Sequence, residues 1–163
     1  FITQHDHDRA IHDAITSSSV DFVFLAGYMA IFGADFTTAF AGRLINIHPS
    51  LLPDFKGLDT HQRAIDAQTK YHGATVHLVT AELDDGPIIL QAQLSVLPED
   101  DVDRLAARVL KLEHCLYPFV LRCLCEGYLK LFADRVTWYN TDRALQLVSA
   151  DSRYDLAKAL KWP

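Results

Sequence analysis

The fold is decided by a short apolar segment that ends in a polar pair, Arg43-Leu44-Ile45-Asn46-Ile47-His48, followed directly by Pro49. The apolar run predicts a buried strand over 43–47. Residues two apart in a strand point to the same face, so Asn46 and His48 should lie side by side where this strand ends. Ligands of open α/β sheets collect at the carboxyl ends of strands, and the pair is therefore a candidate site.

The pair has a definite chemistry when a carboxylate joins it. An Asn amide can donate to a developing oxyanion, and a His can exchange protons near neutral pH. Asp84 lies in the turn signal Asp84-Asp85-Gly86-Pro87, where it can hold the His48 ring in its protonated form. No G-x-S-x-G motif occurs, and the three cysteines lack the sequence context of an activated nucleophile. The set predicts acyl transfer in which the substrate's own amine attacks.

A plainer interpretation stays open for each motif taken alone. An Asn-x-His at a strand end is also typical of a polar pair that only satisfies its own hydrogen bonds. Asp-Asp-Gly-Pro is also typical of a simple turn.

Helices and strands alternate on both sides of the central strand. We predict helices over 7–18, 34–41, 60–69 and 100–126, with one or two more within 141–160. We predict further strands over 20–25, 75–80 and 87–96, and a hairpin from 129–131 and 136–139. This order indicates an α/β domain of three layers, with a mostly parallel, mixed sheet and helices on both faces. The sheet should be mixed because its later strands follow each other without a long helix.

Composition restricts the class of partner. The 163 residues fit one domain, 1–163, whose tail 141–163 is hard to assign. The formal charge of −6 opposes a nucleic-acid partner. We find neither a signal peptide nor an uncharged apolar run of about 18 residues, so we expect no membrane partner and a cytoplasmic location. The chain begins with Phe1 rather than Met, and we expect it to be part of something longer.

We expect several other histidines and the cysteines to have structural rather than catalytic roles. The run His5-Asp6-His7-Asp8 lacks a second ligand cluster with zinc spacing, so we expect a solvated helix entry and no metal. We expect His77 to be a structural histidine. The three cysteines, Cys115, Cys123 and Cys125, lie in one apolar helical pattern, which indicates reduced core thiols in a reducing compartment.

Three ordered blocks carry a resemblance to a known family. They are Asn46-Ile47-His48-Pro49-Ser50-Leu51-Leu52-Pro53, His72-Gly73-Ala74-Thr75-Val76-His77 and Glu82-Leu83-Asp84-Asp85-Gly86-Pro87-Ile88-Ile89. Together they resemble the folate-dependent formyltransferase family over residues 1–140. The segments Asp59-Thr60-His61-Gln62-Arg63-Ala64 and Leu112-Glu113-His114 are most similar to those members that act on glycinamide ribonucleotide. The resemblance implies a Rossmann-like formyltransferase fold.

The resemblance also implies a reaction, in which the formyl group of 10-formyltetrahydrofolate passes to the amine of glycinamide ribonucleotide in purine biosynthesis. It implies that Asn46 stabilises the oxyanion, that His48 is the polarising acid and proton shuttle, and that Asp84 orients His48. Glu113 matches a position that binds the ribonucleotide. The implied pterin cleft is lined by Leu25, Met29, Ile31, Phe32 and Val79, with Asp84 and the backbone between Val79 and Asp84. These small molecules would be the partners of a monomer or homodimer.

Two departures from the family pattern keep alternatives open. The family's glycine-rich phosphate loop and first βα units precede the residues seen here, so the chain corresponds to the C-terminal two-thirds of the domain. Ala30 occupies a place where the family usually has Arg, which matters if that Arg pairs with a folate carboxylate. The alternatives are a formyltetrahydrofolate hydrolase, in which water is the acceptor, and a catalytically incomplete folate-binding fragment.

Overall fold

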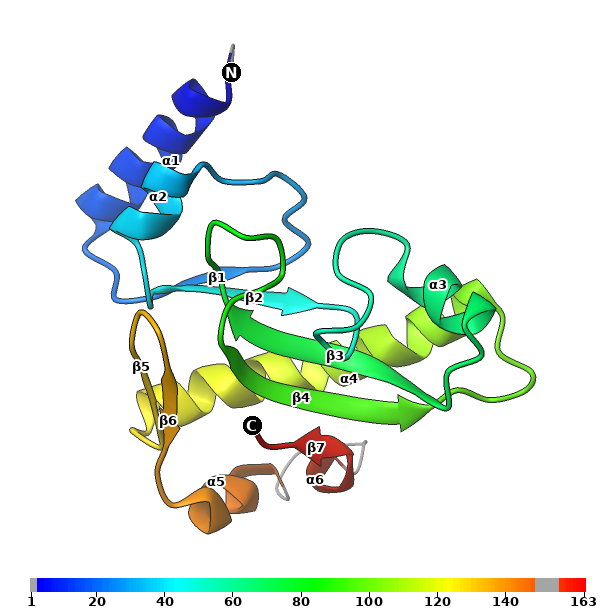
Figure 1. Cartoon of the computed structure of the whole chain (residues 1–163). Helices are drawn as coiled ribbons and strands as arrows, with labels where there is room; N and C mark the ends of the chain where they lie inside the picture. Colours follow the sequence, from blue (N-terminus) through cyan, green and yellow to red (C-terminus); the bar gives the residue numbers. More distant parts are fainter. Residues whose placement is uncertain (1–2, 149–155) are drawn as a thin grey trace.

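The computed structural model describes residues 3–148 and 156–163 (Figure 1). The helices are α1 (Gln4–Ser18), α2 (Ala34–Ala39), α3 (Thr60–Asp66), α4 (Val102–Cys125), α5 (Thr141–Val148) and α6 (Leu156–Ala159). The strands are β1 (Val23–Leu25), β2 (Leu44–His48), β3 (Tyr71–Leu78), β4 (Ile88–Ser95), β5 (Leu129–Leu131), β6 (Val136–Trp138) and β7 (Leu160–Lys161). None of the described helices is long and apolar enough to cross a membrane.

The central sheet has the order β1-β2-β3-β4-β7, and β5 and β6 form the predicted hairpin. The mixed character of the sheet is confirmed. The expectation of a mostly parallel sheet is wrong for the described strands, because only β1 and β2 run parallel, joined by a crossover through α2. The β2–β3, β3–β4 and β4–β7 pairs are antiparallel. Strand β3 runs antiparallel to β2 although α3 lies between them in the chain, and β4 follows β3 directly without a helix.

Helices cover both faces of the sheet, as predicted (Figure 1). Leu44 and Ile45 are adjacent in β2 and so point to opposite faces. Ile45 belongs to the larger core beneath α4, whereas Leu44 packs with Phe36 of α2, with Phe40 directly after α2 and with Ile15 of α1. Asn46 and His48 follow Leu44 at two-residue steps, so they lie on the face of the smaller cluster.

The long helix α4 is formed as its sequence predicts. Asp101 caps it by accepting a hydrogen bond of 2.8 Å from the Arg104 amide. Its apolar stripe is fully buried and consists of Leu105, Val109, Leu112, Leu116, Val120 and Cys123. The hydroxyl of Tyr117 lies 2.9 Å from the Leu25 carbonyl and 2.8 Å from that of Ile45, and it shares its proton between them. Helix α4 is therefore tied to the strands that carry the candidate site.

Several predicted boundaries move for identifiable reasons. Helix α1 begins earlier than predicted because Thr3 caps it, accepting from the Asp6 amide at 3.1 Å. Strand β3 begins four residues before the predicted strand, because Gly73 allows β4 to approach: a Cβ there would lie 2.0 Å from the Ala92 carbonyl oxygen.

The C-terminal region and the cysteines bring two further corrections. Helices α5 and α6 fall within the predicted 141–160, part of which lies outside the described residues, and strand β7 was not predicted. All three cysteines are free, but Cys125 is exposed, so its placement in the core is wrong. It falls in the last turn of α4, where the helix ends in solvent.

Candidate active site

The end of β2 brings the predicted histidine and carboxylate together. His48 Nδ1 lies 3.3 Å from Asp84 Oδ2, and both side chains are nearly buried, at 7% and 9% exposure. Asp84 reaches this position from the β3–β4 connection, with a left-handed backbone at φ 49° that Asp tolerates better than most residues. Its Oδ2 also accepts a hydrogen bond of 2.9 Å from the Gly57 amide. The structure therefore joins the two groups that the sequence pattern pairs.

The two ring nitrogens of His48 both face protein acceptors. Nε2 donates to the Phe55 carbonyl at 3.0 Å, while Nδ1 faces the Asp84 carboxylate. A ring that carries a proton on each nitrogen satisfies both partners. Proton transfer to a substrate therefore requires His48 to exchange one of these partners for the reacting group.

Asn46 lies beside His77, which the sequence predicts to be a structural histidine. Asn46 and His77 are cross-strand neighbours, with Asn46 Nδ2 3.3 Å from His77 Nε2. His77 Nδ1 donates to the Leu78 carbonyl at 2.9 Å, which leaves Nε2 as an acceptor for the amide. Burial lowers the pKa of His77, and this opposes protonation of that acceptor. His77 thus orients the Asn46 amide, and the antiparallel register of β2 and β3, invisible in the sequence, is what pairs them.

A cleft of about 730 Å³ opens beside these groups. Its size suits a drug-sized ligand. All of the predicted cleft residues line it, namely Leu25, Met29, Ile31, Phe32, Val79 and Asp84. Met29 and Ile31 are exposed by 75% and 62%. Leu58 and Leu83, whose side chains are not among those predicted to line the cleft, are exposed by 67% and 53%. Four large apolar side chains exposed around one cleft indicate a binding surface for an apolar part of a ligand.

Glu113 lines the same cleft from α4. Burial raises the pKa of its carboxyl to about 7, above its ordinary value of 4.5. A carboxylate held in a partly apolar wall is unfavourable unless a ligand supplies donors, so Glu113 is a candidate for hydrogen bonds to a polar substrate. Ala30 also lines this cleft.

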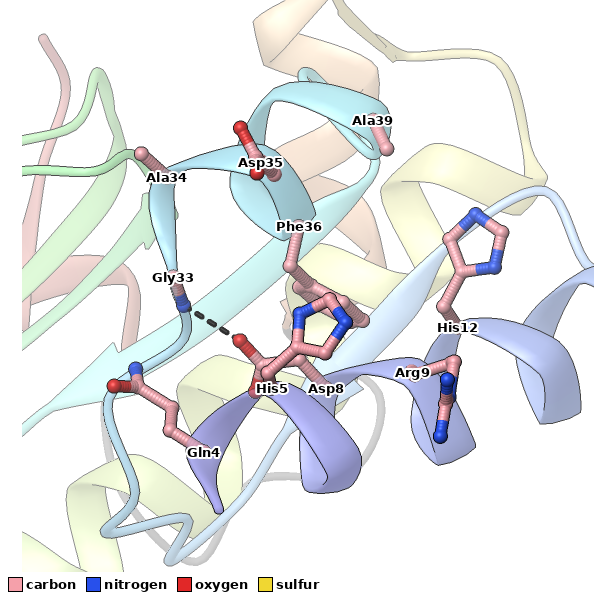
Figure 2. Close-up of a pocket in the computed structure, with 10 residues that line it drawn as sticks. All are labelled: Gln4, His5, Asp8, Arg9, His12, Gly33, Ala34, Asp35, Phe36 and Ala39. Atoms are coloured by element: carbon pink, nitrogen blue, oxygen red, sulfur yellow. Dashed lines mark hydrogen bonds between the residues drawn. The ribbon is translucent and has the colours of Figure 1, made fainter.

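A second cavity of about 480 Å³ lies between α1 and α2 (Figure 2). Asp8, buried at its edge, accepts a hydrogen bond of 2.7 Å from the Gly33 amide (Figure 2). His7 also lies within 3.1 Å of both Asp8 Oδ1 and the Tyr28 hydroxyl. These polar residues therefore attach α1 to the segment after β1, rather than forming only a solvated helix entry. Within the described residues no group of histidine, cysteine or acidic side chains is arranged to hold a metal.

Taken together, the cleft has an amide donor, an imidazole beside a carboxylate, and apolar walls. Among the described residues that line it there is no serine or cysteine. Such a set of groups is suited to acyl transfer in which the substrate supplies the nucleophile.

Comparison with known proteins identifies the family to which the chain belongs. The sequence pattern of the family described as formyl transferase matches residues 1–121, and the chain belongs to this family. The chain is 47% identical over 131 residues to the phosphoribosylglycinamide formyltransferase of Haemophilus influenzae, an alignment that covers 80% of this chain and 62% of that protein. The chain therefore spans less than two-thirds of the length of this relative.

Solved structures agree with this assignment. The phosphoribosylglycinamide formyltransferase of Coxiella burnetii superposes with a TM-score of 0.80 at 41% identity, covering 85% of this chain and 65% of that one. A formyltetrahydrofolate deformylase from Pseudomonas syringae pv. tomato superposes with a TM-score of 0.75 at 30% identity, covering 81% of this chain and 44% of that one. The formyltransferase fold is thereby confirmed.

Proposed function

We propose that this chain carries the catalytic centre that transfers the formyl group of 10-formyltetrahydrofolate to the amine of glycinamide ribonucleotide, in purine biosynthesis. The observation that carries the proposal is the Asn46 amide beside the His48–Asp84 pair, at the edge of an apolar cleft. Relatives named phosphoribosylglycinamide formyltransferase support the choice of acceptor.

The proposed reaction uses these groups in order. The amine of the acceptor attacks the formyl carbon, and the carbonyl oxygen becomes an oxyanion that the Asn46 amide stabilises. His48 exchanges its Phe55 or Asp84 partner for the reacting group and supplies the proton that the leaving folate nitrogen needs. Asp84 stabilises the protonated ring, and the proton that the attacking amine loses passes to His48, which restores the protonated ring.

The two substrates would occupy different parts of the cleft. The apolar side chains of Leu25, Met29, Ile31 and Phe32, with Val79, suit the flat pterin ring of the donor. Glu113 would accept hydrogen bonds from hydroxyl groups of the ribonucleotide. These bonds would replace the hydrogen bonds to water that its carboxylate loses in the partly apolar wall.

The remaining parts of the proposal concern partners and location. We propose that catalysis needs no metal, that the protein acts as a monomer or homodimer without nucleic acid, and that it works in the cytoplasm. The division of 1–163 as a single formyltransferase domain remains a prediction.

The test follows the consumption of 10-formyltetrahydrofolate by the chain, with and without glycinamide ribonucleotide. Consumption that requires the ribonucleotide supports the proposal. Consumption that proceeds equally without it would identify a deformylase, and no consumption in either case would identify a catalytically incomplete fragment. His48→Ala is the matched control, because it should abolish whichever activity is seen.

A further inference from the structure

The loop that follows β2, residues 49–58, contacts both members of the catalytic pair. Its Phe55 carbonyl accepts the hydrogen bond from His48 Nε2 at 3.0 Å. Two residues later, its Gly57 amide donates to Asp84 Oδ2 at 2.9 Å. The orientation of the His48 ring and of the Asp84 carboxylate therefore depends on the position of this loop.

A buried polar cluster on the next two strands fixes the loop. Thr75 Oγ1 donates to the Ser50 carbonyl at 2.7 Å and accepts from the Leu52 amide at 3.0 Å. Gln91 Nε2 donates to the Leu52 carbonyl and to Thr75 Oγ1, each at 2.8 Å. Ser50 Oγ donates to the Asp54 carbonyl at 2.6 Å. The cluster thus holds several backbone groups at the start of the loop.

The hydrogen bonds of this cluster leave no donor unused. A hydroxyl has one proton and two lone pairs, and Thr75 Oγ1 uses all three. The amide nitrogen of Gln91 has two protons, and both are engaged. Because Thr75 and Ser50 are fully buried, water cannot replace a missing partner without cost. The direction of each bond is consequently fixed, and only a donor can occupy the Nε2 position of Gln91.

The cluster lies in register with the catalytic histidine but outside the cleft. His48 pairs with Thr75 across β2 and β3, and Thr75 pairs with Gln91 across β3 and β4. The three residues form a row across the sheet. Neither Thr75 nor Gln91 lines the cleft, so neither side chain acts on a substrate directly.

We propose that Gln91 is a positioning residue for the catalytic pair: its side-chain amide, through Leu52 and Thr75, holds loop 49–58 where Phe55 and Gly57 orient His48 and Asp84. Its effect on turnover rests on the proposed function, whereas its effect on the His48 ring does not. Much of the cleft wall, residues 28–32 and 79–83, belongs to other segments, and of the large apolar side chains exposed around the cleft only Leu58 comes from the loop. Loss of the Gln91 donors should therefore lower kcat more than it raises KM for the formyl donor.

Gln91→Glu is the sharpest perturbation, because it keeps the shape and replaces the donor with an acceptor that faces the Leu52 carbonyl. A displacement of about 1 Å at a reacting group costs about 10²-fold in rate, so we expect kcat to fall by about 10- to 100-fold with KM changed less than about threefold. Gln93→Glu is the matched control, since Gln93 lies two residues along the same face and donates no hydrogen bond to residues 49–58 within the described structure. It should leave kcat unchanged.

A pair of substitutions at Thr75 keeps the test valid if Gln91→Glu does not fold. Thr75→Val keeps the shape and removes the hydroxyl, and it should lower kcat as Gln91→Glu does. Thr75→Ser keeps the hydroxyl and should retain kcat within about threefold. Equal kcat in the two Thr75 variants would overturn the proposal, because the hydroxyl network would then play no part.

The final readout is the ¹⁵N NMR signal of the His48 ring, which needs no turnover. We expect Gln91→Glu, at a temperature well below its unfolding, to change the His48 ring-nitrogen shifts while those of the distant, exposed His5 stay fixed. Unchanged His48 signals would overturn the proposal. If the wild-type chain transfers no formyl group but the His48 signals move, the positioning role stands and the proposed function fails.

Discussion

We expect the substitution Glu113→Gln to raise the free energy of unfolding above pH 7, because the buried carboxylate of Glu113 destabilises the folded protein there. In the folded protein, burial raises the pKa of this carboxyl to about 7 from an ordinary 4.5. Below pH 4.5 the group is protonated in both folded and unfolded states and costs nothing. Between pH 4.5 and 7 the unfolded chain loses the proton first, so stability falls as pH rises, and above pH 7 the full penalty is present.

The magnitude follows from the size of this rise. At about 1.36 kcal/mol per pH unit, it corresponds to about 3.4 kcal/mol against the charged form. The side chain is only partly buried, and solvent screening reduces the expected effect to about 1–2 kcal/mol. Glu113→Gln has no charge to bury. It should therefore be more stable than the wild type by about 1–2 kcal/mol at pH 8 and equal to it at pH 4.5.

Urea denaturation of the wild type and of Glu113→Gln at both pH values measures this difference directly. Glu99→Gln is the control, because Glu99 is an exposed loop residue and should change stability by less than about 0.5 kcal/mol at either pH. A Glu113→Gln protein no more stable than the wild type at pH 8 would refute the reasoning. In the transferase assay, the same substitution should raise KM for the ribonucleotide.

Four further predictions concern individual groups. Asn46→Ala should lower kcat by about 10²–10³-fold through loss of the oxyanion donor, and His48→Ala by about 10²–10⁴-fold through loss of proton transfer, both measured by single-turnover kinetics. Burial lowers the pKa of His72 to about 4, below its ordinary 6.5. The unfolded chain therefore binds a proton first as the pH falls from 6.5 towards 4, and the folded protein loses stability over this range. His72→Gln should remove this loss, about 2–3 kcal/mol, from the curve of stability against pH. Gly86→Ala should destabilise by more than about 2 kcal/mol in thermal unfolding, because its Cβ would lie 1.8 Å from the Leu78 carbonyl oxygen.

Local rules are sufficient where one element determines the geometry. The two-residue period of a strand is enough to predict that Asn46 lies beside His48, and both lie at the end of β2. The apolar period of α4 predicts that helix to within two residues at either end, since a long amphipathic helix is a strong signal.

Groups that depend on pairing between elements could not be predicted in the same way. His77 meets Asn46, and Gln91 meets Leu52, only through the antiparallel register of β2, β3 and β4. A shift of one residue would turn each of these side chains to the other face of the sheet. The short strand β7 carries no periodic signal at all, because pairing with β4 alone defines it.

Three non-glycine residues in the loops around the site have a left-handed backbone, and the sheet holds these loops in place. Phe55, Asp59 and Asp84 have left-handed φ values of 56°, 57° and 49°. Such a conformation is tolerated by Asp but unfavourable for a bulky residue such as Phe55, by about 1–2 kcal/mol. Phe55 adopts this conformation where its carbonyl accepts a hydrogen bond from His48 Nε2. The hydrogen bonds of Thr75 and Gln91 hold the start of the same loop. Strain at the catalytic pair is thus balanced by hydrogen bonds on the neighbouring strands, where a substitution would touch no substrate and still disturb the chemistry.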